Sequence, residues 1–573
     1  MGHGHHHHPH DHTHDHAHDT PADNGPLPAA LDANVPDSEL SPSQLSRRSM
    51  LRRTGLLGAG LAGAGVLGGA TTAAADSKGS PLGSRSKSNG FLWLAGDHHI
   101  HTQYSSDGKY RVIDQVRQGT AHGLDWMVIT DHGSEAHAKI GVDKVNPDIK
   151  EARKVFKDQL VFQGLEWNIP GAEHATVFVH PGSNEVEVLK RFENDYDGSL
   201  HPSSSNDVNE ALAISGLQFL ADQVRRRKVD DALMLANHPA RNGIDSPHEI
   251  RGWRDATSSD HPIAIGMEGA PGHQAAGLPA PKGGAQARGF YGNGPSANSF
   301  PGYPADSYRT WGGFDWMTST VGGLWDSLLA EGKPWWITAN SDSHRVYADP
   351  SMTGPNDNFN VNGRHADPVY SSDGLNLAEG DYWPGHYSRT HVGADRFSYA
   401  AVMDGMRAGR IWVDHGALIS GLDVRIKGSS RWTTLGGALH TKRGDNVELT
   451  IEIALANGAN WAQFVPKLAR VDIIQGDVTG PVRDKDTFTA PTAKVVKSFE
   501  VNESTGTVKL TYKLGKVSSP LYVRLRGTDG KRSAVGVHGA AVDPFGPAID
   551  VVGSADPWQD LWFYSNPIWV LPS

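Results

Sequence analysis

Short apolar runs alternate with longer amphipathic segments between Phe91 and about Gly416. The short runs predict buried strands, and the recurrence of apolar residues every three to four positions predicts helices. The expected strands are 91–95, 126–130, 160–165, 232–236, 263–267 and 335–339, and the expected helices are 113–122, 208–228, 323–332 and 398–409. This alternation favours a largely parallel sheet or a (β/α) barrel over residues 91–416.

The pattern changes at about residue 417. Alternating apolar and polar residues predict strands at 422–426, 447–456, 470–475, 507–514 and 521–526, with turn residues between them. A C-terminal all-β, sandwich-like domain over 417–573 is the simplest interpretation. Two segments rich in Gly, Pro and aromatic residues, about 269–322 and 345–394, are expected to be insertions in the first domain.

The first ninety residues have a different character. Residues 1–46 hold ten histidines within their first eighteen positions and lack apolar periodicity, which predicts disorder; a purification tag and a metal-scavenging tail are both compatible with them. Residues 47–75 join Arg47-Arg48 to a Gly/Ala/Leu core and an A-x-A end, as in a twin-arginine signal peptide. Residues 76–90 predict a linker. We therefore expect export by the twin-arginine machinery to a secreted, cell-surface or periplasmic location, with no membrane span in the mature protein.

Composition narrows the possible chemistry. The chain has 573 residues, which predicts two or more domains, and it has no cysteine. Disulfides, thiolate metal sites, iron–sulfur clusters and a cysteine nucleophile are therefore excluded. The formal net charge of -11 argues against a stable nucleic-acid partner.

Nearly every predicted strand of the first domain ends in residues that bind metals. These are His99 and His101, Asp131 and His132, Glu166, His238, and Asp342 with His344. Because the carboxyl ends of parallel barrel strands open onto one face, we expect these side chains to converge. Imidazole and carboxylate ligands suit zinc, manganese or iron.

The series His99-Ile100-His101-Thr102 with Ser106-Asp107-Gly108, Thr130-Asp131-His132, Gly164-Leu165-Glu166, Asn237-His238-Pro239 and Asp342-Ser343-His344 resembles the polymerase-and-histidinol-phosphatase (PHP) superfamily. The resemblance covers roughly 91–416 without the two insertions. It implies a distorted (β/α)7 barrel that holds three divalent ions, which would be Zn, Mn or Fe.

The resemblance also implies how the ligands are shared. One ion is expected to be bound by His99, His101, Glu166 and Asp342. Glu166 is expected to bridge to a second ion held by His174 and His238, and the third ion is expected to be bound by His132, His344 and Asp107.

Some positions remain open at this stage. Compared with the family pattern H-x-H-T-x-x-S-D-G, this sequence has one additional residue between Thr102 and Asp107. Either Ser106 or Asp107 therefore fills the ligand position. His180 is the alternative to His174. Asp131 is expected to orient His99, His101 or His132, and Glu268 is expected to line the site without binding metal.

The expected activity is that of a metal-dependent phosphoric ester hydrolase. Clustered divalent ions supply hydroxide and neutralise phosphate oxygens, so we expect metal-bound hydroxide to hydrolyse a small phosphomonoester or phosphodiester. Glu166, Asp342 and Arg241 are the expected catalytic residues, with Arg241 pairing with phosphate; a surface salt bridge is its alternative role. An exonuclease acting on nucleic acid, a non-catalytic cell-surface binding module and C–N bond hydrolysis are the alternative functions.

Overall fold

The computed structural model describes residues 87–290, 294–530 and 546–573. The expected His-rich segment and signal peptide lie outside the described residues. Within the described part of the chain, no helix has the length and apolar character needed to cross a membrane.

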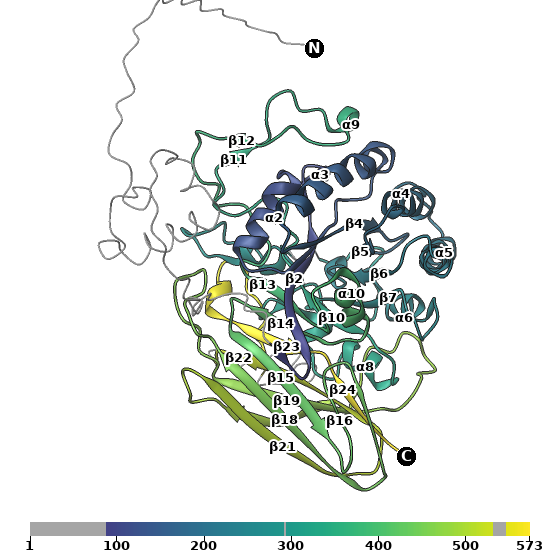
Figure 1. Ribbon diagram of the computed structural model, residues 1–573, viewed down its shortest axis with the longest axis vertical. Helices are drawn as coiled ribbons and strands as arrows, with labels where there is room; N and C mark the ends of the chain where they lie inside the picture. The colour runs from purple at the N-terminus through teal and green to yellow at the C-terminus, as the bar shows by residue number, and fades with distance from the viewer. Residues whose placement is uncertain (1–86, 291–293, 531–545) are drawn as a thin grey trace, which may run out of the picture. The chain divides into compact units, whose positions relative to one another are not determined.

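A large mixed sheet forms the centre of the fold (Figure 1). Its first seven strands are β2 (Phe91–Ile100), β3 (Trp126–Ile129), β4 (Leu160–Asn168), β5 (His174–Val179), β6 (Ala232–Ala236), β7 (Ala264–Ala270) and β10 (Trp336–Ala339). They lie in the order β10-β7-β6-β5-β4-β3-β2, and all are parallel except β5, which is antiparallel to β4 and β6. The six predicted strands are present, whereas β5 was not predicted.

Helices pack against these strands (Figure 1). They are α2 (Val112–Ala121), α3 (Val142–Val155), α4 (Glu185–Tyr196), α5 (Asn206–Arg225), α6 (Pro247–Asp255), α8 (Leu324–Ala330) and α10 (Tyr399–Arg407). Helices α3, α4 and α6 were not predicted. The start of α6 nevertheless has a clear sequence signal, because Ser246 and Glu249 form a capping box around Pro247.

The same sheet continues into the C-terminal part of the chain. Strand β13 (Ser388–Ala394) pairs with β2 and with β14 (Ile411–His415), and β23 (Trp562–Ser565), β22 (Leu521–Thr528), β19 (Arg470–Asp477) and β20 (Lys494–Glu500) follow. The end of the second expected insertion is therefore a strand of the sheet. At the other edge, the bridge Ile100–Ser343 connects the end of β2 to the segment after β10. A closed (β/α)7 barrel remains a prediction.

A second sheet packs beside the C-terminal strands. It contains β16 (Trp432–Thr433), β15 (Ile419–Lys427), β18 (Asp445–Leu455) and β21 (Thr507–Val517). Val424 and Ile451 from this sheet share one hydrophobic cluster with Ile473, Val523 and Phe563 from the large sheet. The C-terminal region is thus rich in β-structure, as expected, with its core between two layers.

Short elements complete the structure. They are β1 (Lys87–Ser88), β8 (Thr310–Trp311), β9 (Phe314–Asp315), β11 (Ser351–Met352), β12 (Val369–Tyr370), β17 (Ala438–Thr441), β24 (Ile568–Pro572), α7 (Trp316–Ser319), α9 (Phe359–Asn362), a π-helical turn at His137–Gly141, and 3₁₀ turns at Arg241–Gly243, Gln274–Gly277, Arg288–Phe290 and Pro557–Gln559.

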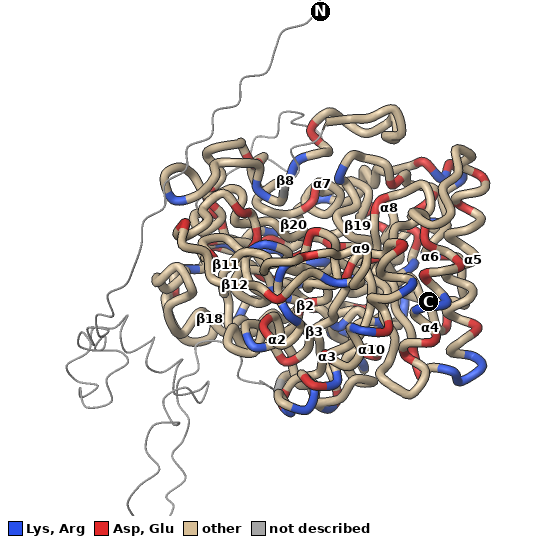
Figure 2. The backbone as a smooth tube through the Cα atoms, turned by 90° about the horizontal axis from the view of Figure 1, so that it is seen from above, with Lys and Arg blue, Asp and Glu red and all other residues tan. Residues whose placement is uncertain are grey.

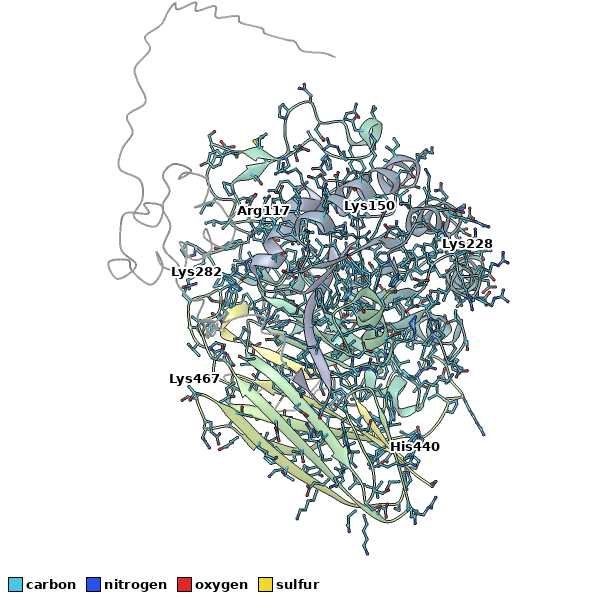
Figure 3. The ribbon with its side chains drawn as sticks, viewed as in Figure 1. Arg117, Lys150, Lys228, Lys282, His440 and Lys467 are labelled. Atoms are coloured by element: carbon cyan, nitrogen blue, oxygen red, sulfur yellow. The ribbon has the colours of Figure 1, made fainter. Side chains whose placement is uncertain are left out.

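Charged residues of both signs are interspersed over the described chain (Figure 2). Arg117, Lys150, Lys228 and Lys467 lie at separate places on its periphery (Figure 3).

Candidate metal centre

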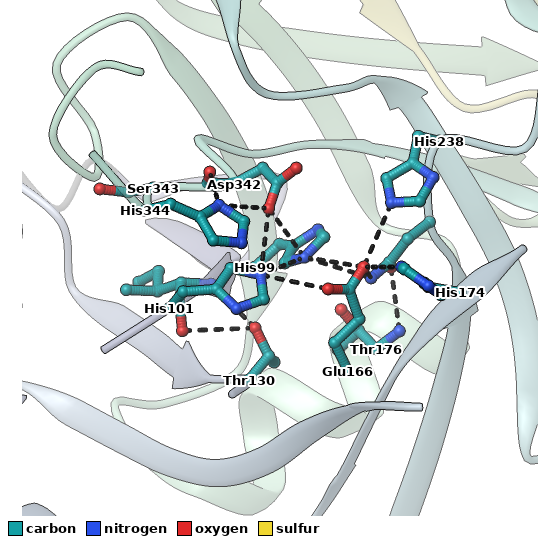
Figure 4. A network of polar contacts seen from close by, with 12 residues as sticks. His99, His101, Thr130, Glu166, His174, Thr176, His238, Asp342, Ser343 and His344 are labelled. Atoms are coloured by element: carbon teal, nitrogen blue, oxygen red, sulfur yellow. Dashed lines mark hydrogen bonds and ion pairs between the residues drawn. The ribbon is translucent and has the colours of Figure 1, made fainter. Parts of the chain in front are cut away.

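The expected ligands meet at one edge of the large sheet, where the parallel strands end (Figure 4). His99 lies near the carboxyl end of β2, and Glu166 lies near that of β4. His174 is the first residue of β5. Because β5 runs opposite to its neighbours, its first residue reaches the edge where the other strands end. The reversal of one strand thus brings His174 to the centre.

Glu166 is surrounded by imidazoles. Its Oε1 atom lies 3.1 Å from His174 Nδ1 and 3.2 Å from the Nε2 atoms of His99 and His238. Its Oε2 atom lies 2.9 Å from His132 Nδ1 and 3.2 Å from His101 Nε2. Burial favours the neutral acid, but the neighbouring imidazoles, His99 first, hold the pKa of Glu166 well below its usual range. One buried carboxylate therefore connects five histidines.

Asp342 faces the same group from the segment after β10. Its Oδ1 atom lies 3.0 Å from His99 Nε2 and 3.1 Å from His101 Nε2, and these two nitrogens are 2.9 Å apart. Oδ1 is nevertheless buried and accepts no hydrogen bond of good geometry from the described residues. The ligand atoms of His99, His101, Glu166 and Asp342 lie within 4.8 Å of one another, as a shared cation requires.

A second group surrounds Asp107. Its carboxylate lies 3.3 Å from His132 Nε2 and 3.5 Å from His344 Nε2, and half of the side chain is exposed. Ser106 is exposed, and its carbonyl oxygen lies 2.8 Å from His365 Nε2. The structure therefore brings the side chain of Asp107 to the expected ligand position.

A third group lies around His174. It includes His238 and also Glu173, which was not predicted. His238 Nδ1 lies 3.6 Å from Glu173 Oε2. The alternative ligand, His180, follows the other end of β5, with its Nδ1 3.5 Å from Asp230 Oδ2. The structure brings His174 into the cluster and leaves His180 outside it.

The donor atoms fit divalent cations. Four buried atoms of the cluster have no hydrogen-bond partner among the described residues: Asp342 Oδ1, Asp107 Oδ1, His344 Nε2 and His238 Nδ1. Buried polar atoms are normally paired, so such a concentration calls for another partner. A set of imidazoles and carboxylates without thiolates suits Zn²⁺, Mn²⁺ or Fe²⁺.

Residues 97–235 match the PHP domain. The match begins just before His99 and ends before His238, so it covers part of the chain and leaves Asp342 and His344 outside. It supports the PHP superfamily and a general role as a metal-dependent hydrolase.

Comparison with other proteins adds two similar structures. A two-domain protein from Bacteroides vulgatus containing a predicted PHP-like metal-dependent phosphoesterase is 14% identical, with a TM-score of 0.32; 82% of this chain and 97% of that chain are covered. A mutant β-glucosidase from Listeria innocua in complex with laminaribiose is 18% identical, with a TM-score of 0.11, over 22% of this chain and 16% of that chain. No curated protein matches the chain.

Other carboxylates contact the residues of the cluster from behind. Glu268 Oε1 lies 2.6 Å from His99 Nδ1, and its Oε2 accepts a 2.7 Å hydrogen bond from the backbone N–H of His238. Such outer carboxylates fix the tautomer and orientation of a metal-binding imidazole. Asp131 accepts hydrogen bonds from the backbone N–H and hydroxyl of Thr102, the residue after His101. Asp131 therefore supports the ligand segment, whereas direct contact with a ligand imidazole had been expected.

Residues at this edge have unusual backbone conformations. His238, His273 and Asp342 have φ values of 30°, 53° and 47°. Residues other than glycine adopt this left-handed region in only a few per cent of cases, although Asn, Asp and His do so more often than the rest, and such conformations are concentrated at functional sites. The surrounding packing therefore holds these three residues in place at some cost in stability.

Arg241 lies in the 3₁₀ turn that follows His238. Its Nε atom is buried without a hydrogen-bond partner among the described residues, and no ion pair found there joins it to the cluster. The structure thus places Arg241 beside a ligand segment but not in contact with the ligands.

The other residues around the cluster differ in how far they could be predicted. Glu268 directly follows a predicted strand and was expected to line the site, whereas Glu173, which was not predicted, directly precedes His174. His273 and Asp381 lie within the two expected insertions. No spacing or periodicity in the sequence connects them to the metal centre.

Proposed function

We propose that the chain is a secreted metal-dependent phosphoesterase that hydrolyses a phosphomonoester or a phosphodiester. The observation that carries this proposal is the contact of one buried carboxylate, Glu166, with five imidazoles, next to a second carboxylate, Asp342, whose Oδ1 atom lies 3.0–3.1 Å from two of the same imidazoles. Divalent ions bound there would lower the pKa of water and neutralise phosphate oxygens.

The proposed ligand sets follow the groups of close donor atoms. His99, His101, Glu166 and Asp342 would hold one ion. Glu166 with His174 and His238 would hold a second, and Asp107, His132 and His344 a third. The closed, distorted (β/α)7 barrel belongs to the same proposal, because it would position these residues on rigid strand ends.

The protein's own residues then have distinct tasks. Glu268 holds His99 through Nδ1, which directs Nε2 of that imidazole towards Glu166 and Asp342. Arg241 would bind phosphate oxygens, since a guanidinium can pair with two oxygens at once and its Nε has no hydrogen-bond partner within residues 87–290, 294–530 and 546–573. Asp107, with half of its side chain exposed, lies on the side of the cluster open to solvent.

Elemental analysis combined with a phosphoester screen tests the proposal. The ten histidines among the first eighteen residues could bind metal by themselves, so the useful quantity is the difference between the wild-type chain and Glu166→Gln, which have the same N-terminal segment. We expect Glu166→Gln to lose bound metal and hydrolytic activity together. Equal metal content in the two proteins, or no hydrolysis of any phosphoester by the metal-loaded wild type, would refute the proposal.

We also propose export by the twin-arginine route, which the sequence of residues 47–75 supports. The test replaces Arg47 and Arg48 together with lysine in the full chain. The wild type should be recovered outside the cytoplasm, and the double variant should be retained inside. Equal export of both proteins would contradict this part of the proposal.

A further inference from the structure

Each of the two insertions contributes one residue of a type that can bind metals, and both residues lie beside the metal centre. His273 lies in the segment after β7, and Asp381 lies before β13, where it bridges to Val346. His273 Nε2 lies 2.9 Å from Asp342 Oδ2, and His273 Nδ1 contacts Asp381 Oδ1. The imidazole is thus held between two carboxylates, one of which belongs to the proposed centre.

The His273 segment is pressed against the ligand segment. A Cβ atom on Gly272 would lie 2.2 Å from Asp342 Cβ and 2.3 Å from the Ser341 carbonyl oxygen, so only glycine permits this approach. His273 itself has a φ of 53°, which is costly for a residue of this type. The fold accepts this strain at a position where the imidazole faces Asp342.

Asp381 contacts both His273 and the backbone of the segment that follows Asp342. Its Oδ1 atom contacts His273, and its Oδ2 atom accepts hydrogen bonds from the backbone N–H groups of His344, at 2.5 Å, and Arg345, at 2.7 Å. The Asp381 side chain is only 3% exposed. A buried carboxylate on one imidazole nitrogen, with the other nitrogen directed at a cluster of ligands, is the arrangement in which histidines bind metals.

We propose that His273 is a further ligand of the metal centre and that, with Asp342 and His344, it binds a divalent cation on the side covered by the two insertions. This inference rests on the proposed function. The ligand atoms of the three residues lie within 4.8 Å of one another. Asp342 then bridges two positions, with Oδ1 towards His99 and Oδ2 towards His273. His344 also belongs to the Asp107 group, so His273 is the ligand that distinguishes the new position.

His273→Asn tests the proposal in the full chain. Asparagine removes the imidazole but tolerates the left-handed backbone, whereas alanine would add strain. His180→Asn is the matched control, because the His180 side chain is 18% exposed against 21% for His273 and lies outside the cluster. The readouts are metal content after dialysis against a chelator and the visible spectrum of the Co²⁺-loaded protein, neither of which depends on activity.

We expect His273→Asn to lose metal and to change the Co²⁺ spectrum, while His180→Asn matches the wild type. Asp381→Asn should weaken metal binding by about 10–100-fold, as loss of an outer carboxylate usually does. It also provides a second variant if His273→Asn does not fold, as judged by circular dichroism.

Two results would separate this inference from the proposed function. If Glu166→Gln loses metal but folded His273→Asn keeps the wild-type metal content, chelator resistance and Co²⁺ spectrum, His273 is not a ligand and only this inference fails. If Glu166→Gln also keeps its metal, the proposed function fails, and this inference fails with it.

Discussion

Two buried aspartates sixteen positions apart have opposite surroundings. Asp326 in α8 receives hydrogen bonds on both oxygens, from Arg524 Nε and Tyr522 on Oδ1 and from Arg524 Nη2 and the Gly322 backbone on Oδ2, at 2.7–2.9 Å. Asp342 has its Oδ1 atom 3.0–3.4 Å from nitrogens of His99, His101 and His344, without a hydrogen bond of good geometry.

The difference shows that a buried carboxylate can either stabilise the fold through an ion pair or be available to bind a metal ion. Asp326 is neutralised by a guanidinium that is itself fully buried, so both oxygens of Asp326 are satisfied within the protein. Asp342 faces imidazoles that can release their protons to accept a metal. We therefore expect changes at the Asp326 pair to reduce stability, and changes around Asp342 and Glu166 to reduce metal binding and catalysis.

The largest expected effect comes from Glu166→Gln. The variant removes the charge that connects five imidazoles, so metal affinity should fall by more than the roughly 10–100-fold that loss of an outer carboxylate costs, and phosphoester hydrolysis should be lost. Metal titration and turnover with a phosphoester substrate measure both quantities. A variant that binds metal as tightly as the wild type would remove Glu166 from its central position.

Asp326→Ala should lower the free energy of unfolding by about 3–5 kcal/mol, because it leaves the buried guanidinium of Arg524 unpaired. The double variant Asp326→Ala with Arg524→Met is the control, and it should recover part of this loss since no buried charge remains. Urea denaturation measures both. A double variant less stable than the single variant would contradict the description of this region as an ion pair.

Removal of metal should destabilise the wild type as well. A ligand present at a hundredfold excess over its Kd stabilises the folded state by about 2.7 kcal/mol, so a chelator should lower the melting temperature. Glu166→Gln should lack this response. Differential scanning calorimetry with and without chelator compares the two proteins, and an equal response in both would place the bound metal elsewhere in the chain.

Arg241 is a partly buried cation, and its Nε has no hydrogen-bond partner in the part of the chain that the structure describes. We expect Arg241→Ala to weaken phosphate recognition by about 1.5–3 kcal/mol, seen as a higher KM with unchanged metal content. Arg241→Lys should recover only part of the loss, because lysine cannot bind two oxygens in a planar fork. Unchanged kinetics in both variants would assign Arg241 a structural role.

The smallest expected effect concerns the pair formed by His248 and Asp486, whose side chains are both partly exposed. His248 Nδ1 lies 2.5 Å from Asp486 Oδ1, and although partial burial opposes it, this carboxylate raises the pKa of His248. The contribution is present below the unfolded pKa of about 6.5 and is lost as the pH rises through the raised folded pKa. His248→Asn should therefore destabilise the protein by a few tenths of a kcal/mol at pH 5.5 and by less at pH 8.5, measured by urea denaturation. An equal loss at both pH values would contradict a charged pair.

The convergence of the strand-end residues could be predicted because one physical rule covers them. Parallel strands end at the same edge, so His99, His132, Glu166 and Asp342 could be expected to converge from distant positions. His174 needed the family resemblance, since nothing in its local sequence reveals that β5 runs in the opposite direction.

Strand β13 was not predicted from the sequence, because several of its buried residues are polar. Arg389 and His391 are buried there, and both pair with Asp414 on the neighbouring strand β14. Periodicity treats buried polar residues as exposed, so a strand whose charges are neutralised by another segment is read as a loop. The same limit applies to His273 and Asp381, whose contact depends on how two long insertions pack.

Anomalous diffraction from crystals of the full chain is the most direct test of the central claim, because it locates metal ions irrespective of any bound by the N-terminal histidines. We expect more than one peak within coordination distance of the Glu166 and Asp342 carboxylates, at roughly 2.0–2.2 Å for zinc. Metal-supplemented crystals with ordered Glu166, Asp342 and His99 side chains but no anomalous peak between them would contradict it.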